Sequence, residues 1–246
     1  MSSSTLLTVA GRDVLFAHWP VDADVLEPHV PDVLSLEAFD GAAWVSVLAL
    51  ENSAVGLGTG LSSALALAPQ LNLRTYVTHG GESGVYFLSL DSGRRLTAAV
   101  GRRAFGLPFH HAAMRLTRRD DRITFRSRRR GDETPTAVFG ARYRPDGPVF
   151  EADPGTLEAF CVERFRYFFP PGEDRRIDPL RSSNGAVRAG TIDRDPWRLR
   201  PVNVQIRQNT LFEAAGLPAP TSEPAVQYSP GFEMRVGPLE PRGGIE

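Results

Sequence analysis

Apolar residues along the chain fall into short segments that end at glycine, proline or charged residues. Most of these segments alternate apolar and polar positions or form apolar runs of strand length, which predicts strands. Gly80 and Gly81 predict a hairpin turn between two of the strands. The predicted strands are Val14–Trp19, Ala42–Leu50, Leu71–His79, Gly84–Asp91, Thr136–Tyr143, Pro201–Arg207 and Gln227–Val236.

A second hairpin is predicted over Ala112–Arg128, with its turn near Asp120–Asp121. Its apolar side chains are expected to pair across the hairpin, Met114 and Leu116 with Ile123 and Phe125. Arginines dominate its other face and the residues after it: Arg118, Arg119, Arg122, Arg126, Arg128, Arg129 and Arg130. We interpret them as a solvated edge and not as a phosphate-binding strip, because acids lie nearby and no aromatic stacking ladder accompanies them.

Helical periodicity is limited to three stretches. A short helix is predicted between Pro20 and Pro31, and a longer one over Arg94–Arg103. The clearest helix is DPGTLEAFCVERFRYF, with its cap near Asp153 and Pro154 at the first helical position. Few helices beside many strands indicate an α+β protein with a large, mainly antiparallel sheet.

One predicted strand carries an unusual polar face. The period of two along Leu71–Val77 places Asn72, Arg74 and Tyr76 together and the apolar residues opposite. A guanidinium group beside a phenol is suited to holding a small carboxylate or carbonyl group. A buried structural network is the competing interpretation.

Composition narrows the class of protein. The 246 residues have a net charge of −1, so nothing recruits nucleic acid or an anionic membrane by overall charge. The apolar stretch Ala42–Pro69 is interrupted by Glu51 and Asn52, which argues against a membrane span. The N-terminus lacks a signal-peptide pattern and a single cysteine permits no internal disulfide, so we expect a cytoplasmic protein.

The chain has no lysine, because all 28 basic residues counted as lysine plus arginine are arginine. An arginine side chain stays protonated and cannot form a Schiff base, so lysine imine chemistry is excluded. Metal and serine hydrolase sites also lack support, because the histidines show no ligand spacing and no G-x-S-x-G motif is present. Cys161 is interpreted as a core residue. Arg164, on the apolar side of its predicted helix, is expected to need a carboxylate partner.

Several longer motifs carry a family resemblance over most of residues 14–236. In chain order they are FAHWPVDADVLEPHVP, FDGAAWVSV, LNLRTYV, GVYFLSLD, LPFHHA, GTLEAFCVERF and DPWRLRPV. Together they resemble the YqjF-like bacterial family, which is similar in fold to acetoacetate decarboxylase. The resemblance implies one domain over residues 1–246, built as a cone-shaped antiparallel β-barrel with peripheral helices and a cavity inside.

The segment Gly101–His110 resembles the decarboxylase pattern G-R-E-x-x-G-[FY]-P-K-K, which carries the Schiff-base lysine in that family. Here Phe109 and His110 follow the proline in place of two lysines, and Arg103 replaces the acid. The resemblance therefore extends to the scaffold and the place of the pocket, and not to the imine chemistry. Arg194 and Asp195 stand where relatives often have a histidine before the Pro-Trp pair.

We interpret the chain as a small-molecule-binding protein with lyase- or isomerase-like acid-base chemistry on an organic acid or carbonyl compound. The expected catalytic residues are His110 and Tyr76, without metal or cofactor. A noncatalytic ligand-binding or sensing protein is the main alternative, and a barrel filled by its own side chains is a third. A homo-oligomer is compatible with the sequence. The expected ligand-binding residues are Arg74, Arg102, Asn72, Tyr86 and Phe109.

Overall fold

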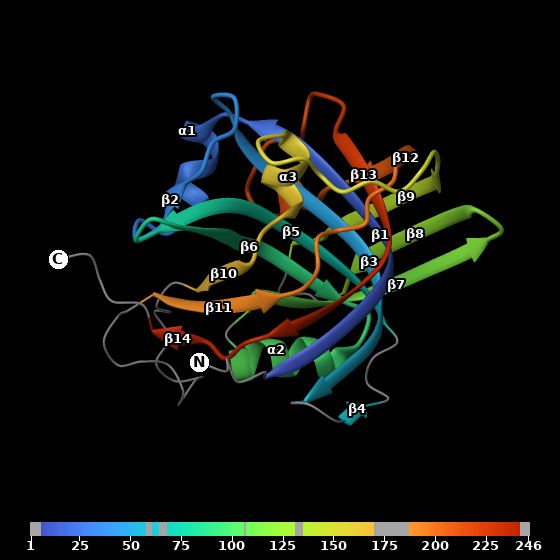
Figure 1. Ribbon diagram of the computed structural model, residues 1–246, viewed down its shortest axis with the longest axis horizontal. Helices are drawn as coiled ribbons and strands as arrows, with labels where there is room; N and C mark the ends of the chain where they lie inside the picture. The colour runs from blue at the N-terminus through green and yellow to red at the C-terminus, as the bar shows by residue number, and fades with distance from the viewer. Residues whose placement is uncertain are drawn as a thin grey trace.

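The computed structural model describes residues 6–57, 61–63, 68–105, 107–130, 135–169 and 187–241. Within them the strands join into one mostly antiparallel sheet with short helices around it (Figure 1). The strands are β1 (Leu7–Val21), β2 (Ser35–Leu36), β3 (Ala43–Leu57), β4 (Leu61–Ser63), β5 (Ala68–His79), β6 (Glu82–Ser92), β7 (Phe109–Arg119), β8 (Arg122–Arg129), β9 (Val138–Pro145), β10 (Arg166–Phe169), β11 (Arg188–Asp193), β12 (Val202–Asn209), β13 (Ala225–Val236) and β14 (Glu240–Pro241). The helices are α1 (Ala23–Leu26), followed by a 3-10 turn (Glu27–His29), α2 (Arg95–Phe105), α3 (Leu157–Val162) and α4 (Leu211–Ala214).

Seven strands are paired in a closed order, which we call the strand circuit. Hydrogen bonds run from β6 through β10, β11, β13, β1, β3 and β5, and β5 pairs again with β6. The pairings are antiparallel except that of β6 with β10. β7 continues from β6 in parallel and begins the flanking sheet, which is β7–β8–β9–β12. In Figure 1 the flanking sheet extends to the right of the circuit, α3 lies at the top and α2 at the bottom.

Two large apolar cores follow from this arrangement, besides two smaller clusters among the described residues. The inner core contains apolar side chains from every strand of the circuit, together with Cys161 and Val162 of α3 and the Trp197 segment. The outer core lies between the circuit and the flanking sheet, where Leu71 and Leu73 of β5 join Phe125 and Phe139. The alternating faces of β1, β3 and β5 therefore both meet apolar layers, so these strands are rich in apolar residues throughout.

Most of the predicted elements are present with shifted ends. The predicted strands lie within or overlap β1, β3, β5, β6, β9, β12 and β13, and Gly80 and Gly81 have the positive φ values of the hairpin turn. The helical interpretations of residues 23–29 and 94–103 are confirmed by α1 with its 3-10 turn and by α2. In the second hairpin Leu116 does pair with Phe125, but Met114 pairs with Ser127.

The predicted start of the third helix is wrong. Thr156, and not Asp153, is the N-cap of α3, and its side-chain oxygen accepts from the backbone nitrogen of Ala159. Gly155 has a φ of +85°, so the chain turns sharply before the helix begins. The helix ends at Val162, and residues 166–168 of the predicted helix belong to β10.

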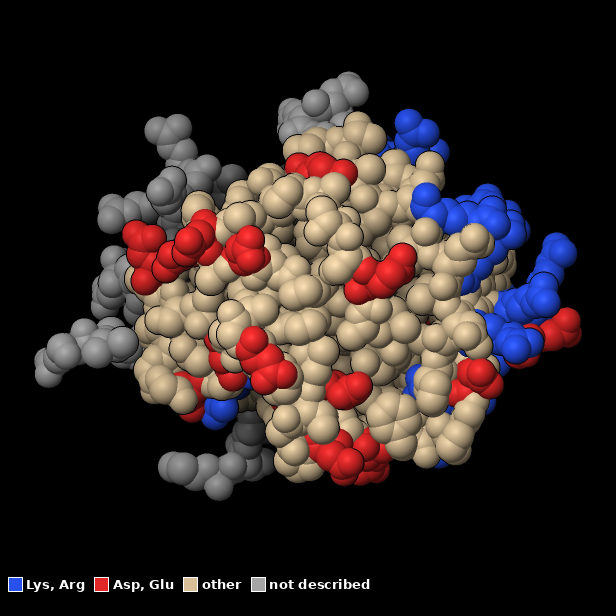
Figure 2. All heavy atoms as spheres, turned by 90° about the horizontal axis from the view of Figure 1, so that it is seen from above, with Lys and Arg blue, Asp and Glu red and all other residues tan. Residues whose placement is uncertain are grey.

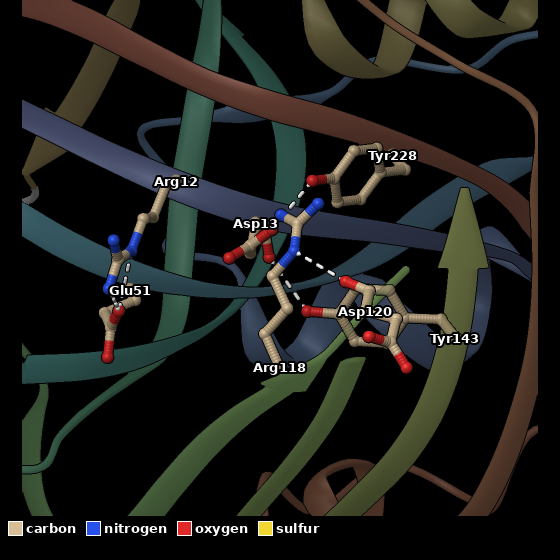
Figure 3. A network of polar contacts seen from close by, with 7 residues as sticks. All are labelled: Arg12, Asp13, Glu51, Arg118, Asp120, Tyr143 and Tyr228. Carbon is tan, nitrogen blue, oxygen red and sulfur yellow. Dashed lines mark hydrogen bonds and ion pairs between the residues drawn. The ribbon is translucent and has the colours of Figure 1, made fainter. Parts of the chain in front are cut away.

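The circuit and the flanking sheet are tied by a polar network around Asp13, shown in Figure 3. Asp13 is 2% exposed and has a φ of 53° at an irregularity of β1. Its carboxylate accepts from Tyr228 of β13 and from Arg118 of β7, and its backbone oxygen accepts from Tyr143 of β9. The network therefore joins four strands that are distant in sequence.

Among the described residues, none of the helices has the length and apolar character that a membrane span requires.

Candidate functional site

The inner core contains an uninterrupted group of polar side chains at the level of α3. Tyr76 of β5 is fully buried there, and Arg74, two positions earlier on the same face, is 8% exposed. Ser46 of β3 and His18 of β1 are also fully buried. Buried polar groups in an apolar layer need hydrogen-bond partners, so their contacts determine what this site can do.

A chain of short hydrogen bonds connects four neighbouring strands of the circuit, β5, β3, β1 and β13. The Tyr76 hydroxyl lies 2.5 Å from the Ser46 hydroxyl, which lies 2.6 Å from Nδ1 of His18. Nε2 of His18 lies 2.9 Å from Oε1 of Gln227 on β13. Each hydroxyl and each ring nitrogen in this chain can donate or accept, according to the histidine tautomer. The chain can therefore supply Tyr76 with a donor or an acceptor.

Arg74 and Tyr76 both reach the C-terminal turn of α3. Nη2 of Arg74 donates to the backbone oxygen of Cys161 at 2.8 Å, and the Tyr76 hydroxyl donates to the same oxygen at 3.0 Å. The last carbonyl groups of a helix have no partner within the helix and carry partial negative charge, so they attract donors and cations. Nε of Arg74 is buried and has no hydrogen-bond partner.

Two further arginines bind neighbouring carbonyl groups of α3. Arg164 donates to the oxygen of Phe160, and Arg194 donates to the oxygen of Val162. Both are paired with carboxylates, Arg164 with Glu37 at 2.7 Å and Arg194 with Glu163 at 3.0 Å. The expected carboxylate partner of Arg164 is thus confirmed.

The site has an excess of positive charge. Three arginines meet two carboxylates around the end of α3, and among the described residues Arg74 has no carboxylate partner. Burial lowers the pKa of Arg194 to about 10, and the positive charge of Arg74 contributes in the same direction. An anion beside Arg74 would offset this repulsion.

Burial also sets the protonation of the uncharged groups. It lowers the pKa of His18 to about 3, with a further contribution from the charge of Arg74, so the imidazole is neutral at pH 7. Burial raises the pKa of the Tyr76 phenol well above 10, and that of the Cys161 thiol to about 12. Tyr76 is consequently a donor, and Cys161 is not a nucleophile at neutral pH.

The structure groups only part of the predicted site. Asn72 lies on the same face of β5 as Arg74 and accepts from Gln70. Tyr86 pairs with Thr75 across the hairpin, so its side chain lies on the face opposite to that of Arg74. There it packs against the apolar cluster that contains Val77. The side chain of Arg102 lies outside the described residues, although its backbone belongs to α2.

The side chains of the two residues in the place of the decarboxylase lysines lie on opposite faces of β7. Phe109 packs with Leu90 and Ala98 against α2. His110 follows Phe109 in β7 and pairs with Asp91, so its side chain leaves the opposite face. His111 lines an open groove of about 410 Å³ on β7 and β8, to which Arg74 and Tyr76 do not contribute.

The residues that the sequence did not single out as a site are His18, Ser46, Gln227 and the paired Arg194 and Glu163. A signal for His18 was present, because it shares the period-two face of Val14 and Phe16 in an apolar strand. No local pattern connects it to Ser46 or Gln227, which belong to strands far away in sequence.

Comparisons with known proteins agree on the family and the fold. Residues 9–233 match DUF2071, described as an uncharacterized conserved protein. The uncharacterized protein YqjF of Bacillus subtilis (strain 168) is 35% identical over 230 residues, covering 93% of this chain and 89% of that protein.

Among solved structures, the enduracididine biosynthesis enzyme MppR in complex with pyruvate has a TM-score of 0.63 at 11% identity, over 99% of this chain and 93% of that one. An acetoacetate decarboxylase-like enzyme from Sphingomonas wittichii RW1 has a TM-score of 0.62 at 15% identity, over 98% and 94%. Acetoacetate decarboxylase from Legionella pneumophila has a TM-score of 0.62 at 14% identity, over 96% and 88%. The TM-scores show a shared fold, and at such low identities the similarity shows the fold alone.

Proposed function

The chain belongs to the DUF2071 family, and from this premise we propose that its inner core binds a small organic acid or carbonyl compound. In this proposal the strand circuit is the wall of a cone-shaped β-barrel. Arg74 holds the carboxylate of the ligand, and the Tyr76 hydroxyl turns its single proton from the Cys161 oxygen to a second oxygen of the ligand. The related MppR structure contains pyruvate, a small keto acid, which makes pyruvate a suitable first probe.

One observation carries the proposal: Arg74 is buried with an unused donor and no carboxylate partner among the described residues. A buried guanidinium group without a counterion is costly, whereas a bidentate carboxylate satisfies both its charge and its donors. Asn72, on the same strand face, is a further polar position for ligand contact in this proposal. The proposal gives no role to His110, Tyr86 or Phe109.

Tyr76 supports lyase- or isomerase-like chemistry on such a ligand. A phenol that remains protonated can stabilise an oxyanion that develops on a carbonyl oxygen, and Ser46 and His18 orient the phenol. The ligand cannot be held as a lysine imine, because the chain has no lysine. A noncatalytic binding protein is the second candidate, and the low pKa of His18 favours it, because this histidine is a weak base.

The first test is a thermal-shift screen with pyruvate and other keto, hydroxy and unsaturated carboxylic acids. We expect at least one acid to raise the Tm of the wild-type protein, because a ligand that binds only the folded state stabilises it. Arg74→Gln should abolish this rise. Arg142→Gln, at an exposed arginine of β9, is the matched control and should retain it. A rise that is unchanged in Arg74→Gln, or a flat screen throughout, would contradict the proposal.

Proton NMR of each stabilising acid, incubated with the protein, separates the two candidates. Consumption of the acid that is lost in Tyr76→Phe, while the Tm rise remains, identifies an enzyme in which Tyr76 takes part in the chemistry. A Tm rise without consumption identifies a binding protein.

A further inference from the structure

A second charged site lies outside the inner core, on the face of the hairpin formed by β7 and β8. An open groove of about 410 Å³ runs there beside the start of α2. Among the described residues its walls contain no acidic residue and no phenylalanine, tyrosine or tryptophan. They consist of Gly93, His111, Ala112, Ala113, Met114, Arg115, Arg126 and Arg130.

Three arginines of the groove have no counterion among the residues that the structure describes. Arg115 and Arg126 stand directly opposite each other in the antiparallel pairing of β7 and β8. Like charges in this position repel and destabilise the sheet. Within the described residues neither side chain, nor that of Arg130, forms an ion pair or a side-chain hydrogen bond. By contrast, Arg118 and Arg129 of the same hairpin are paired with Asp13 and Asp91.

The surroundings add to the positive potential. Figure 2 shows most of the basic side chains of this face at one end of the molecule, on the side of the flanking sheet, with a few acidic side chains among them; the rest of this face carries mainly acidic side chains. The first turn of α2 carries no acidic residue, so the positive end of its dipole is not offset by one. The positive charges also act on His111. Its pKa is lowered by burial and by the charges of Arg95 and Arg130.

We propose that this groove binds the phosphate group of a small phosphorylated compound. Several guanidinium groups suit the oxygens of phosphate, which accept paired hydrogen bonds and carry more charge than a single carboxylate. A single-stranded nucleic acid fits less well, because the described lining holds no phenylalanine, tyrosine or tryptophan and so lacks a ladder of rings on which successive bases stack. The site is independent of the proposed ligand of Arg74, and it revises the interpretation of this hairpin as merely a solvated edge.

The test uses the full-length protein and inorganic pyrophosphate as the probe. Pyrophosphate is titrated by calorimetry, and the imidazole signals of His111 are followed by NMR across pH. Binding should raise the pKa of His111, because the added negative charge stabilises the imidazolium form. The double variant Arg115→Gln/Arg126→Gln should weaken the binding by about tenfold or more, in line with the loss of two charge-assisted contacts.

The matched control is Arg119→Gln/Arg122→Gln. These arginines also stand opposite each other in the same hairpin, but they lie outside the groove. The control should bind pyrophosphate as the wild type does, and circular dichroism checks that both double variants are folded. Equal weakening in both variants would show general charge attraction and overturn the proposal, as would an absence of binding. Tighter binding of a short single-stranded RNA than of pyrophosphate would assign the groove to nucleic acid instead.

Discussion

His18, Ser46 and Tyr76 are fully buried, and their hydrogen bonds form one chain through the inner core. In this environment a charge on the imidazole is unfavourable, so the pKa of His18 falls to about 3. The sequence indicated that Tyr76 and Arg74 share a strand face, and the structure confirms this. The partners of Tyr76 were not predictable, because Ser46 and His18 appear in the sequence as isolated polar residues within apolar strands.

A pH-dependent stability follows from His18. Below pH 6.5 the unfolded chain takes up a proton that the folded protein resists until about pH 3, so the free energy of unfolding falls as the pH drops through this window. The contribution is about 1.4 kcal/mol per pH unit at most. Between pH 7.5 and pH 5, urea unfolding should show the wild type losing about 2 kcal/mol relative to His18→Gln. His29→Gln, at a histidine outside the inner core, is the control and should lose stability as the wild type does. An equal loss of stability in the wild type and in His18→Gln would refute the assignment.

At the scale of elements, α2 is held in place by a glycine that accommodates Phe109. A Cβ atom at Gly101 would lie 2.2 Å from the Phe109 ring, closer than real contacts allow. The sequence predicted this helix correctly from its periodicity but assigned Phe109 to ligand binding. In the structure the ring packs between β6 and α2, because Phe109 starts β7 opposite Leu90, and its ligand contact stays a prediction.

Gly101→Ala should therefore destabilise the protein. In an open helix position the change would stabilise by about 1 kcal/mol, but here overpacking should cost about 1 to 3 kcal/mol. Urea unfolding measures the difference. Gly140→Ala in β9, where the nearest atom to the new Cβ lies at 3.9 Å, is the control and should show no comparable loss. In a Phe109→Leu background the cost of Gly101→Ala should shrink, and an undiminished cost would mean that another contact is responsible.

At the scale of the whole molecule, the Asp13 network fastens the flanking sheet to the strand circuit (Figure 3). The Tyr228 hydroxyl donates to the Asp13 carboxylate at 2.7 Å, and Arg118 donates to the same oxygen at 2.6 Å. The carboxylate is buried, so water does not replace a donor that is lost. The loss of either donor therefore leaves the negative charge poorly solvated. Burial and the nearby Asp13 charge raise the pKa of Tyr228 to about 12, so its hydroxyl remains a donor at neutral pH.

Tyr228→Phe should lower the free energy of unfolding by about 1 to 3 kcal/mol, the range for a lost hydrogen bond to a buried charged group. Tyr167→Phe is the matched control, since no hydrogen bond of its hydroxyl is present among the described residues. Guanidinium denaturation of both variants gives the comparison. Combining Tyr228→Phe with Arg118→Gln should be non-additive, because both side chains share one carboxylate oxygen; strict additivity would argue against a common network.

The sequence by itself determined the longer strands, the positions of α1 and α2, the turn at Gly80–Gly81 and the absence of lysine chemistry, because these depend on local periodicity and residue type. The tertiary structure alone decided which polar residues meet. His18 and Gln227 are 209 positions apart and touch only because β13 pairs with β1. The β5–β6 register shifts between Leu73 and Arg74, a detail that no alternation pattern encodes. Non-local pairing thus placed Arg74 beside α3. It also placed the side chains of Tyr86 and His110 on strand faces opposite to that of Arg74.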